Sequence, residues 1–465
     1  MGRAVGRGAL LWLVLFVVYA GTLGLRAGPA GDYGPGEAHR LLLAESIVSD
    51  RDIDLADEYR ERAWTDFYDG ELRPAGRVTD HRRAEPTEVG LALLIAPGYA
   101  LAGPTGAELV IAALAALAFV LSAALARRLV PDPWATAAPL VVALSPPALA
   151  YATAVYPEMP AAAALAAAVL LALRTREHPR VRWAAAAAAC LAVLPWLGLK
   201  YLPAAAVVGS VLVAWMLKRH RGLAALVAAE VAFTSLVTFV SFNDALYSGL
   251  TPFSALSDGA TATGAETAGD YTGRVDRLVG LWLDRDVGLL RWAPFLVLAF
   301  LGAWLLWRSR RERVARAVPE QADRDAAAGL LCAAVLAQIL TAAFFAPFLA
   351  GPWFAGRQAV ATLPLLGALA AWGLRHAPRV GTALAAFTLA GSVWLYLAVR
   401  LGDDRLVHPT TGAPWGPLEA LLPRSGTPYA DVVALAALAA LAALGGREWL
   451  RRRRARAAAL PRPVG

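Results

Sequence analysis

Cysteine and charge are both scarce in this sequence. The two cysteines, Cys190 and Cys332, lie in separate apolar runs, and there is no CxxC motif or Cys/His cluster. This argues against a disulfide framework and a zinc site. Charged residues make up 17% of the 465 positions, whereas 58% are hydrophobic and the mean hydropathy is +0.51. Because a soluble protein of this length cannot bury so much apolar surface, the composition predicts an integral membrane protein.

Long apolar runs, bounded by charges or by Pro and Gly, divide the chain. A helix that crosses a bilayer needs about 20 apolar residues, so twelve helices would use roughly 240 positions, which fits this length. The expected fold class is all-α: a polytopic membrane protein with about twelve transmembrane helices in a single domain over residues 1–465. The runs are 8–26, 105–126, 134–152, 160–174, 183–199, 202–217, 222–242, 291–307, 327–347, 359–374, 380–399 and 431–446.

A shorter apolar run at 89–103 is interrupted by Pro97-Gly98 and is too short to cross a bilayer. We expect it to form a juxtamembrane helix on the outer face, so that the first outer loop extends over 27–104. The other long segments are expected to be outer loops at 243–290 and 400–430 and a basic cytoplasmic tail at 447–465.

The distribution of charge gives the expected orientation. If the N-terminus is cytoplasmic, the inner side holds 26 basic and 7 acidic residues and the outer side 18 basic and 28 acidic residues. Such an asymmetry follows the positive-inside rule. We therefore expect a plasma-membrane protein with both termini in the cytoplasm. The net charge of +8 then reflects topology and does not indicate a nucleic-acid partner.

Two carboxylates near the start of the first outer loop, Asp32 and Glu37, precede an amphipathic helical stretch. Partial desolvation at the water boundary can raise the pKa of a carboxyl group toward the range of a general base. Both residues are therefore candidate catalytic groups. The alternative is that they solvate and cap a surface helix.

The second outer loop is very short and contains Tyr156-Pro157-Glu158-Met159-Pro160. Two prolines hold Glu158 rigidly, which suits a carboxylate that faces a shared cavity. Acidic residues also favour helix N-termini, so Glu158 could equally cap the helix that follows.

Cations are the minority on the acidic outer side, and two of them, Lys200 and Arg357, lie at outer helix boundaries. A lipid-linked phosphate at the bilayer surface would be bound by such a pair, with Arg as a bidentate donor and Lys as a point charge. Snorkelling to the interface is the alternative for each residue taken singly. Glu230 is the acid that lies well inside a predicted span, which marks it as a weaker functional candidate.

This order of features resembles the GT-C superfamily of integral-membrane glycosyltransferases, in particular the bacterial polyprenyl-phosphate-sugar transferases related to protein O-mannosyltransferases and lipid A aminoarabinose transferases. In that family an Asp-Glu pair opens the first outer loop. Here Glu37 matches the second acid, and Gly36 occupies the Asp position. The role of the base would then fall to Glu37 or to Asp32, or the protein would lack activity.

Other segments extend the resemblance. The Tyr156-Pro157-Glu158 stretch resembles the acidic site of the family's second loop. Residues 283–290, which include Asp284, and the pair Gly356-Arg357 resemble segments of actinobacterial members. The resemblance implies that substrate contacts come from His39, Tyr156, Lys200, Asp284 and Arg357.

The family's reaction is an inverting displacement in which a carboxylate deprotonates an acceptor hydroxyl, which attacks the anomeric carbon and expels a polyprenyl phosphate. The implied partners are a polyprenyl-phosphate sugar donor, membrane lipids and a cell-envelope glycan, lipid or protein acceptor. A divalent cation, Mg²⁺ or Mn²⁺, is compatible with this chemistry, and no other cofactor is implied. The alternatives are a twelve-span secondary transporter and a non-catalytic GT-C-like protein that binds a lipid-linked sugar or serves as a scaffold.

Overall fold

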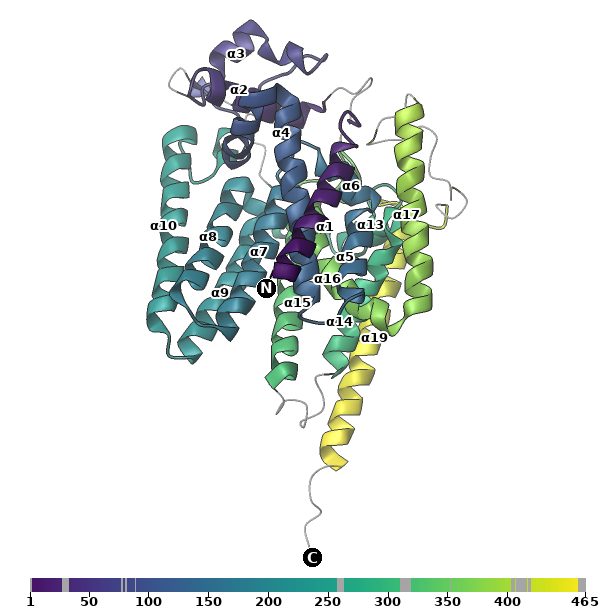
Figure 1. Cartoon of the computed structure of the whole chain (residues 1–465). Coiled ribbons are helices and arrows are strands. Elements are labelled where there is room, and N and C mark those ends of the chain that lie inside the picture. The colour runs from purple at the N-terminus through teal and green to yellow at the C-terminus, as the bar shows by residue number, and fades with distance from the viewer. Residues whose placement is uncertain are drawn as a thin grey trace, which may run out of the picture.

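The computed structural model describes residues 2–26, 33–76, 78–79, 82–87, 89–256, 263–309, 319–351, 353–402, 406, 416 and 420–458. Over these residues the protein is a helical bundle with one very small strand pair. Figure 1 shows the long helices running roughly parallel to one axis, with α2 and α3 gathered at one end. The connection between α9 and α10 lies at the opposite end (Figure 1).

The first hundred residues build the end of the bundle that carries α2 and α3. After α1 (Gly2–Ala20), the chain forms α2 (Pro35–Ser49), α3 (Ala56–Glu61), the 3-10 helix η2 (Ala63–Asp66) and the strands β1 (Val78–Thr79) and β2 (Arg82–Arg83). The strands pair antiparallel, with Val78 opposite Arg83. Helix α2 begins at a proline, whose missing N–H costs nothing in a first turn, and packs against α4.

The remaining long helices form the body of the bundle. They are α4 (Val89–Ala126), α5 (Trp134–Ala143), α6 (Pro146–Ala152), α7 (Glu158–Glu177), α8 (Val181–Leu197), α9 (Leu202–Lys218), α10 (Gly222–Tyr247), α14 (Val297–Ser309), α15 (Pro319–Phe345), α16 (Leu363–His376), α17 (Pro378–Leu401) and α19 (Pro428–Ala458). Shorter helices connect them: η3 (Leu199–Tyr201), η4 (Pro252–Ala255), α11 (Ala268–Thr272), α12 (Arg277–Leu283), α13 (Leu289–Trp292), η5 (Pro294–Leu296) and η7 (Arg357–Thr362).

Each of the twelve predicted runs contains helix, but the structure does not show twelve spans. Among the described residues, seven helices are long and apolar enough to cross a membrane, or eight if the bent pair α5 and α6 is one span. The others are too short: α8 has 17 residues and α16 has 14. The bend of 65° between α5 and α6 occurs at Ser145-Pro146-Pro147, where proline cannot continue the helical hydrogen bonds. The protein is therefore an all-α, multi-span membrane protein with seven or eight candidate spans.

Helix α16 forms the centre of the bundle. Every residue from Leu363 to Leu374 is buried, and the helix packs against α4, α5 and α14. Hydrophobic side chains from nearly all long helices join it in one contiguous core. Alanine is common in this core, and small side chains allow helix backbones to approach closely in a membrane.

Helix α4 contains a sharp kink that separates the short apolar run from the span. Ala102 and Gly103 have non-helical backbone angles, and Gly103 has a positive φ of 59°. After the kink the chain folds back closely: a Cβ on Gly106 would lie 1.9 Å from the carbonyl oxygen of Gly98. Residues 89–101 therefore form a separate short helix before the kink, and the juxtamembrane position of this segment stays a prediction.

We expect Gly106→Ala to destabilise the protein by about 1–3 kcal/mol, because the added methyl group must push the two parts of α4 apart. The matched control is Gly445→Ala in α19, where a Cβ meets nothing within 4 Å and alanine favours the helix. Thermal unfolding of the detergent-solubilised protein measures both. Equal midpoints for the two variants would contradict the close approach at the kink.

Candidate functional site

Four segments that are distant in the sequence converge near the end of the bundle that carries α2. They are the first turn of α2, the start of α7, η3 and η7, which supply Glu37, Glu158, Lys200 and Arg357. Gly356 has a φ of 78°, a left-handed conformation that lets the chain turn into η7 and present the next side chain to α7. The fold thus brings together four of the charged groups that the sequence marked separately.

Glu158 is the centre of an ion cluster. Its Oε1 accepts hydrogen bonds from Lys200 Nζ at 2.7 Å and from Arg357 Nε at 2.8 Å. The side chain of Glu158 is 1% exposed, that of Arg357 11% and that of Lys200 26%, so the lysine is the member that solvent reaches. Lys200 also donates to Gln358 Oε1 at 3.3 Å. Two cations share one carboxylate, so the cluster carries one surplus positive charge.

Aromatic rings hold the Arg357 guanidinium in place. Its Cζ lies 3.8 Å from the centre of the Tyr156 ring and 4.5 Å from that of Trp353. Arg40 also lies over the Tyr156 ring, at 5.2 Å. Cation–π contacts of this kind are strongest where water is excluded, so Tyr156 helps to keep two arginines close together.

Glu37 fastens the start of α2 to the α6–α7 connection. Its Oε1 accepts a hydrogen bond from the Val155 N–H at 2.9 Å, and its Oε2 accepts one from the Gly34 N–H at 3.0 Å. The residue is buried, and burial raises the pKa of its carboxyl group, while the two backbone N–H groups oppose that rise. Glu37 therefore has a structural role in addition to its predicted catalytic one.

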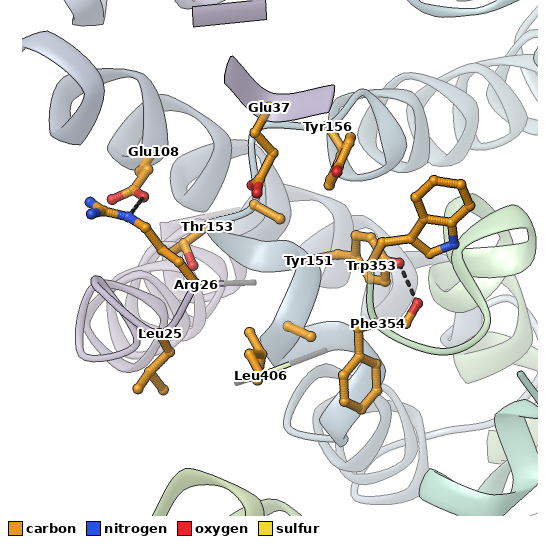
Figure 2. A pocket seen from close by; sticks show the side chains of 12 residues that line it. Leu25, Arg26, Glu37, Glu108, Tyr151, Thr153, Tyr156, Trp353, Phe354 and Leu406 are labelled. Atoms are coloured by element: carbon orange, nitrogen blue, oxygen red, sulfur yellow. Dashed lines mark hydrogen bonds and ion pairs between the residues drawn. The ribbon is translucent and has the colours of Figure 1, made fainter. Parts of the chain in front are cut away.

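A small pocket with a cavity volume of about 20 Å³, partly open to solvent, lies beside the ion cluster (Figure 2). Glu37, Tyr156 and Trp353 contribute to its wall together with apolar groups such as Leu25 and Phe354. In Figure 2, Glu108 and Arg26 lie on one side of Glu37, and Trp353 lies on the other. Tyr151 anchors the wall, because its hydroxyl donates to the Phe354 carbonyl at 2.5 Å.

Glu108 is a pocket residue that the sequence analysis missed. It is 2% exposed, and its Oε1 accepts hydrogen bonds from Arg26 Nε at 3.1 Å and from the Tyr33 hydroxyl at 2.9 Å. The Arg26 guanidinium also lies 4.0 Å from the centre of the Tyr33 ring. A signal was present, because Glu108 is the only charged residue in the 38 residues of α4.

His39 faces away from the pocket, in a separate cluster with Tyr59 and Glu85. The Tyr59 hydroxyl lies 2.6 Å from Glu85 Oε1 and 2.8 Å from His39 Nδ1. Since the hydroxyl has one proton and the carboxylate must receive it, we assign the Nδ1–H tautomer to a neutral His39. Burial, and secondarily Arg40, lower the pKa of His39 to about 4. The structure gives His39 no place beside the ion cluster.

Asp284 also lies outside the pocket lining, and its hydrogen bonds indicate a structural role. Its Oδ1 accepts from the N–H groups of Asp286 and Val287, and its Oδ2 accepts from the N–H and the hydroxyl of Ser425. These bonds join the turn after α12 to the segment before α19. Its assignment to substrate binding remains a prediction from the resemblance.

Two sequence candidates remain. Asp32 lies outside the described residues. Glu230 is exposed on α10, where it accepts a hydrogen bond from the Thr234 hydroxyl at 3.3 Å. Within the described part of the chain, no group of three or more His, Cys, Asp or Glu side chains could hold a metal ion. The divalent cation stays a prediction.

Comparison with known proteins identifies the fold. No protein-family profile and no curated protein sequence matches the chain. Among solved structures, ArnT from Cupriavidus metallidurans in the apo state aligns with a TM-score of 0.55 and 18% identity over 86% of this chain and 70% of that chain. ArnT from the same organism bound to undecaprenyl phosphate aligns with a TM-score of 0.53 and 16% identity, over 85% and 71% of the respective chains. The chain therefore shares its fold with a GT-C lipid A aminoarabinose transferase, in agreement with the resemblance seen in the sequence.

The ion cluster predicts that substitutions of its members have strongly coupled effects on the free energy of unfolding. Glu158→Gln should destabilise the protein by about 3–5 kcal/mol, because it leaves the buried Arg357 without a counter-ion. The exposed pair Arg127–Asp132 supplies the control: Asp132→Asn should cost less than about 1 kcal/mol. Thermal unfolding of the single variants and of the double variant Glu158→Gln/Arg357→Gln measures the coupling. Losses that simply add in the double variant would contradict it.

The lowered pKa of His39 predicts a pH dependence of local stability. The unfolded chain, with a histidine pKa near 6.5, binds more protons than the folded one between about pH 6.5 and pH 4. The stability that neutral His39 contributes is therefore complete above pH 6.5 and is lost as the pH falls toward 4. Hydrogen exchange of α2 and α3, corrected for intrinsic rates, should show increased opening over this range. Opening should depend less strongly on pH in His39→Gln. An unchanged pH dependence would contradict the lowered pKa of His39.

Proposed function

We propose that this protein is an integral-membrane glycosyltransferase that transfers a sugar from a polyprenyl-phosphate donor to a cell-envelope acceptor. The observation that carries this proposal is the convergence of Lys200 and Arg357 on a single buried carboxylate, that of Glu158, beside a pocket lined by further carboxylates. Support comes from the fold shared with ArnT, of which one structure contains undecaprenyl phosphate.

The charge of the cluster fits a phosphodiester. Lys200 and Arg357 carry two positive charges against one negative charge on Glu158. A polyprenyl-phosphate sugar carries one negative charge at its phosphate, which matches the surplus. Lys200 is the exposed cation, and Arg357 is held by two rings in a fixed orientation, as preorganised stabilisation of a leaving group requires.

The proposed reaction is a direct displacement. A pocket carboxylate takes the proton of the acceptor hydroxyl, whose oxygen forms a bond to the anomeric carbon. The bond from that carbon to the phosphate oxygen breaks, and the polyprenyl phosphate leaves with the electron pair. Lys200 and Arg357 stabilise the negative charge that develops on the phosphate. The polyprenyl chain lies among the apolar helices, which explains why an enzyme of this kind is built mostly from membrane spans.

We place the pocket on the extracytoplasmic side of the plasma membrane. The connection from α9 to α10 contains Lys218, Arg219 and Arg221 and lies at the opposite end of the bundle from α2 and α3 (Figure 1). Basic connections favour the cytoplasmic side, so the end with α2 and α3 faces outward. Both termini are then cytoplasmic.

One observation favours a second function, binding of a lipid-linked sugar without turnover. Gly36 has no carboxylate, and a Cβ at this position would lie 3.4 Å from both the Tyr156 hydroxyl and Arg40 Nη1. A Cβ here would already be in van der Waals contact with both groups. Binding of donor without release of polyprenyl phosphate would favour this alternative.

The proposal is tested with undecaprenyl phosphate and polyprenyl-phosphate sugars in nanodiscs. Lys200→Gln and Arg357→Gln should each weaken binding of undecaprenyl phosphate about 10- to 100-fold, because each removes a charge-assisted hydrogen bond. Arg379→Gln, an exposed arginine at the start of α17, is the control and should leave the affinity unchanged. Equal affinities for all four proteins would contradict the phosphate site. In the same preparation, release of polyprenyl phosphate from the sugar donor by the unaltered protein tests the transferase activity.

A further inference from the structure

Two polar side-chain atoms of residues that line the pocket beside the ion cluster form no hydrogen bond. Glu108 Oε2 and the Tyr156 hydroxyl are both enclosed and have no hydrogen-bond partner among the described residues. Both side chains line the pocket, and each residue is at least 97% buried. Because a buried polar group without a partner costs free energy, such atoms indicate where a ligand completes the hydrogen bonding. A ligand hydroxyl is suited to this pocket, since it can donate to a carboxylate and accept from a phenol.

Two groups bind one oxygen of the Glu108 carboxylate. Arg26 forms an ion pair with its Oε1, and the Tyr33 hydroxyl donates to the same oxygen. Both interactions stabilise the carboxylate form. They engage only Oε1, so Oε2 keeps its lone pairs. A carboxylate in this state is a proton acceptor.

The other carboxylates of the site are less suited to this role. Both oxygens of Glu37 accept backbone hydrogen bonds that hold α2 to residue 155. Glu158 has an unpartnered Oε2, but its charge is shared by Lys200 and Arg357, and these two cations oppose its protonation. Gly36 contributes no carboxylate.

The positions of Glu108 and Arg357 relative to the pocket agree with a displacement reaction. Figure 2 shows Glu108 and Arg26 on one side of Glu37 and Trp353 on the other. Arg357 lies 3.8 Å from the centre of the Tyr156 ring and 4.5 Å from that of the Trp353 ring, and Figure 2 shows both rings on the side of Glu37 away from Glu108. An inverting displacement requires the base and the leaving group on opposite faces of the sugar. The arrangement meets this requirement with the sugar between the two sides.

We propose that Glu108 is the general base and that the pocket is the acceptor subsite for a hydroxyl group. This inference rests on the proposed function. Glu108 Oε2 takes the hydroxyl proton as the acceptor oxygen bonds to the anomeric carbon. The bond to the phosphate oxygen breaks, and the polyprenyl phosphate leaves with the electron pair toward Lys200 and Arg357. Glu108 releases its proton to water afterwards.

The test uses water as the acceptor, so that no natural acceptor is needed. The full-length protein in nanodiscs hydrolyses a polyprenyl-phosphate sugar in ¹⁸O-labelled water, and incorporation of the label at the anomeric carbon is followed. Glu108→Gln should lower kcat about 100- to 10,000-fold. Affinity for undecaprenyl phosphate should stay within twofold, because the amide oxygen still accepts from Arg26 and Tyr33. The matched control Glu230→Gln, on the exposed face of α10, should retain the full rate.

Two readouts separate a catalytic role from a structural one. The rate of the unaltered protein should fall at low pH as Glu108 becomes protonated. The residual rate of Glu108→Gln should not show this fall. Added formate should restore part of the kcat of Glu108→Ala by replacing the missing carboxylate, and it should not accelerate the unaltered protein.

The outcomes distinguish this inference from the function on which it rests. A Glu108→Gln rate within threefold of the unaltered protein overturns the base assignment and leaves the proposed transferase intact. Undecaprenyl phosphate binding without any turnover by the unaltered protein overturns the base assignment and favours the non-catalytic alternative. If the unaltered protein neither binds undecaprenyl phosphate nor turns over the donor, the proposed function fails together with this inference.

Discussion

The buried carboxylate of Glu158 is the interaction on which the site depends. It draws η3 and η7 toward the start of α7 through Lys200 and Arg357, which lie 42 and 199 positions further along the chain. Glu158 and Arg357 are buried, so removal of either charge leaves the other without its counter-ion and is costly. A single carboxylate thereby fixes the spacing of two cations, and the aromatic rings around Arg357 fix its direction.

Hydropathy predicts most of the helical architecture but not the lengths of the helices. The run 134–152 reads as one span, yet the structure bends between α5 and α6. The run 359–374 begins with the 3-10 helix η7, and α16 starts only at Leu363. In both places the apolar composition continues through a change of backbone geometry. Apolar character is a property of side chains, whereas helix continuity depends on backbone hydrogen bonds, so the count of spans could not follow from composition alone.

The sequence also identified which charged residues belong to the site, but it predicted less well how they are arranged. Lys200 and Arg357 were singled out by their scarcity on an acidic side, but their shared partner depends on tertiary contacts. The separation of His39 from Glu37 was predictable, because residues two apart on a helix point to different faces. Glu108 was counted among the outer charges because it lies near the predicted end of a span. Its isolation within an apolar helix was the more informative signal.

The kink in α4 has a consequence for how the pocket meets a lipid. One continuous stretch of backbone carries the short helix at residues 89–101 and, a few residues beyond Gly103, the side chain of Glu108. In the proposed setting the short helix rests at the headgroup layer, so the depth of Glu108 below that layer is set by covalent geometry. The bilayer surface is then the reference from which the depth of Glu108 is fixed. A donor whose phosphate lies among the headgroups meets the pocket at a constant height, and the thickness of the hydrocarbon layer becomes a determinant of substrate alignment.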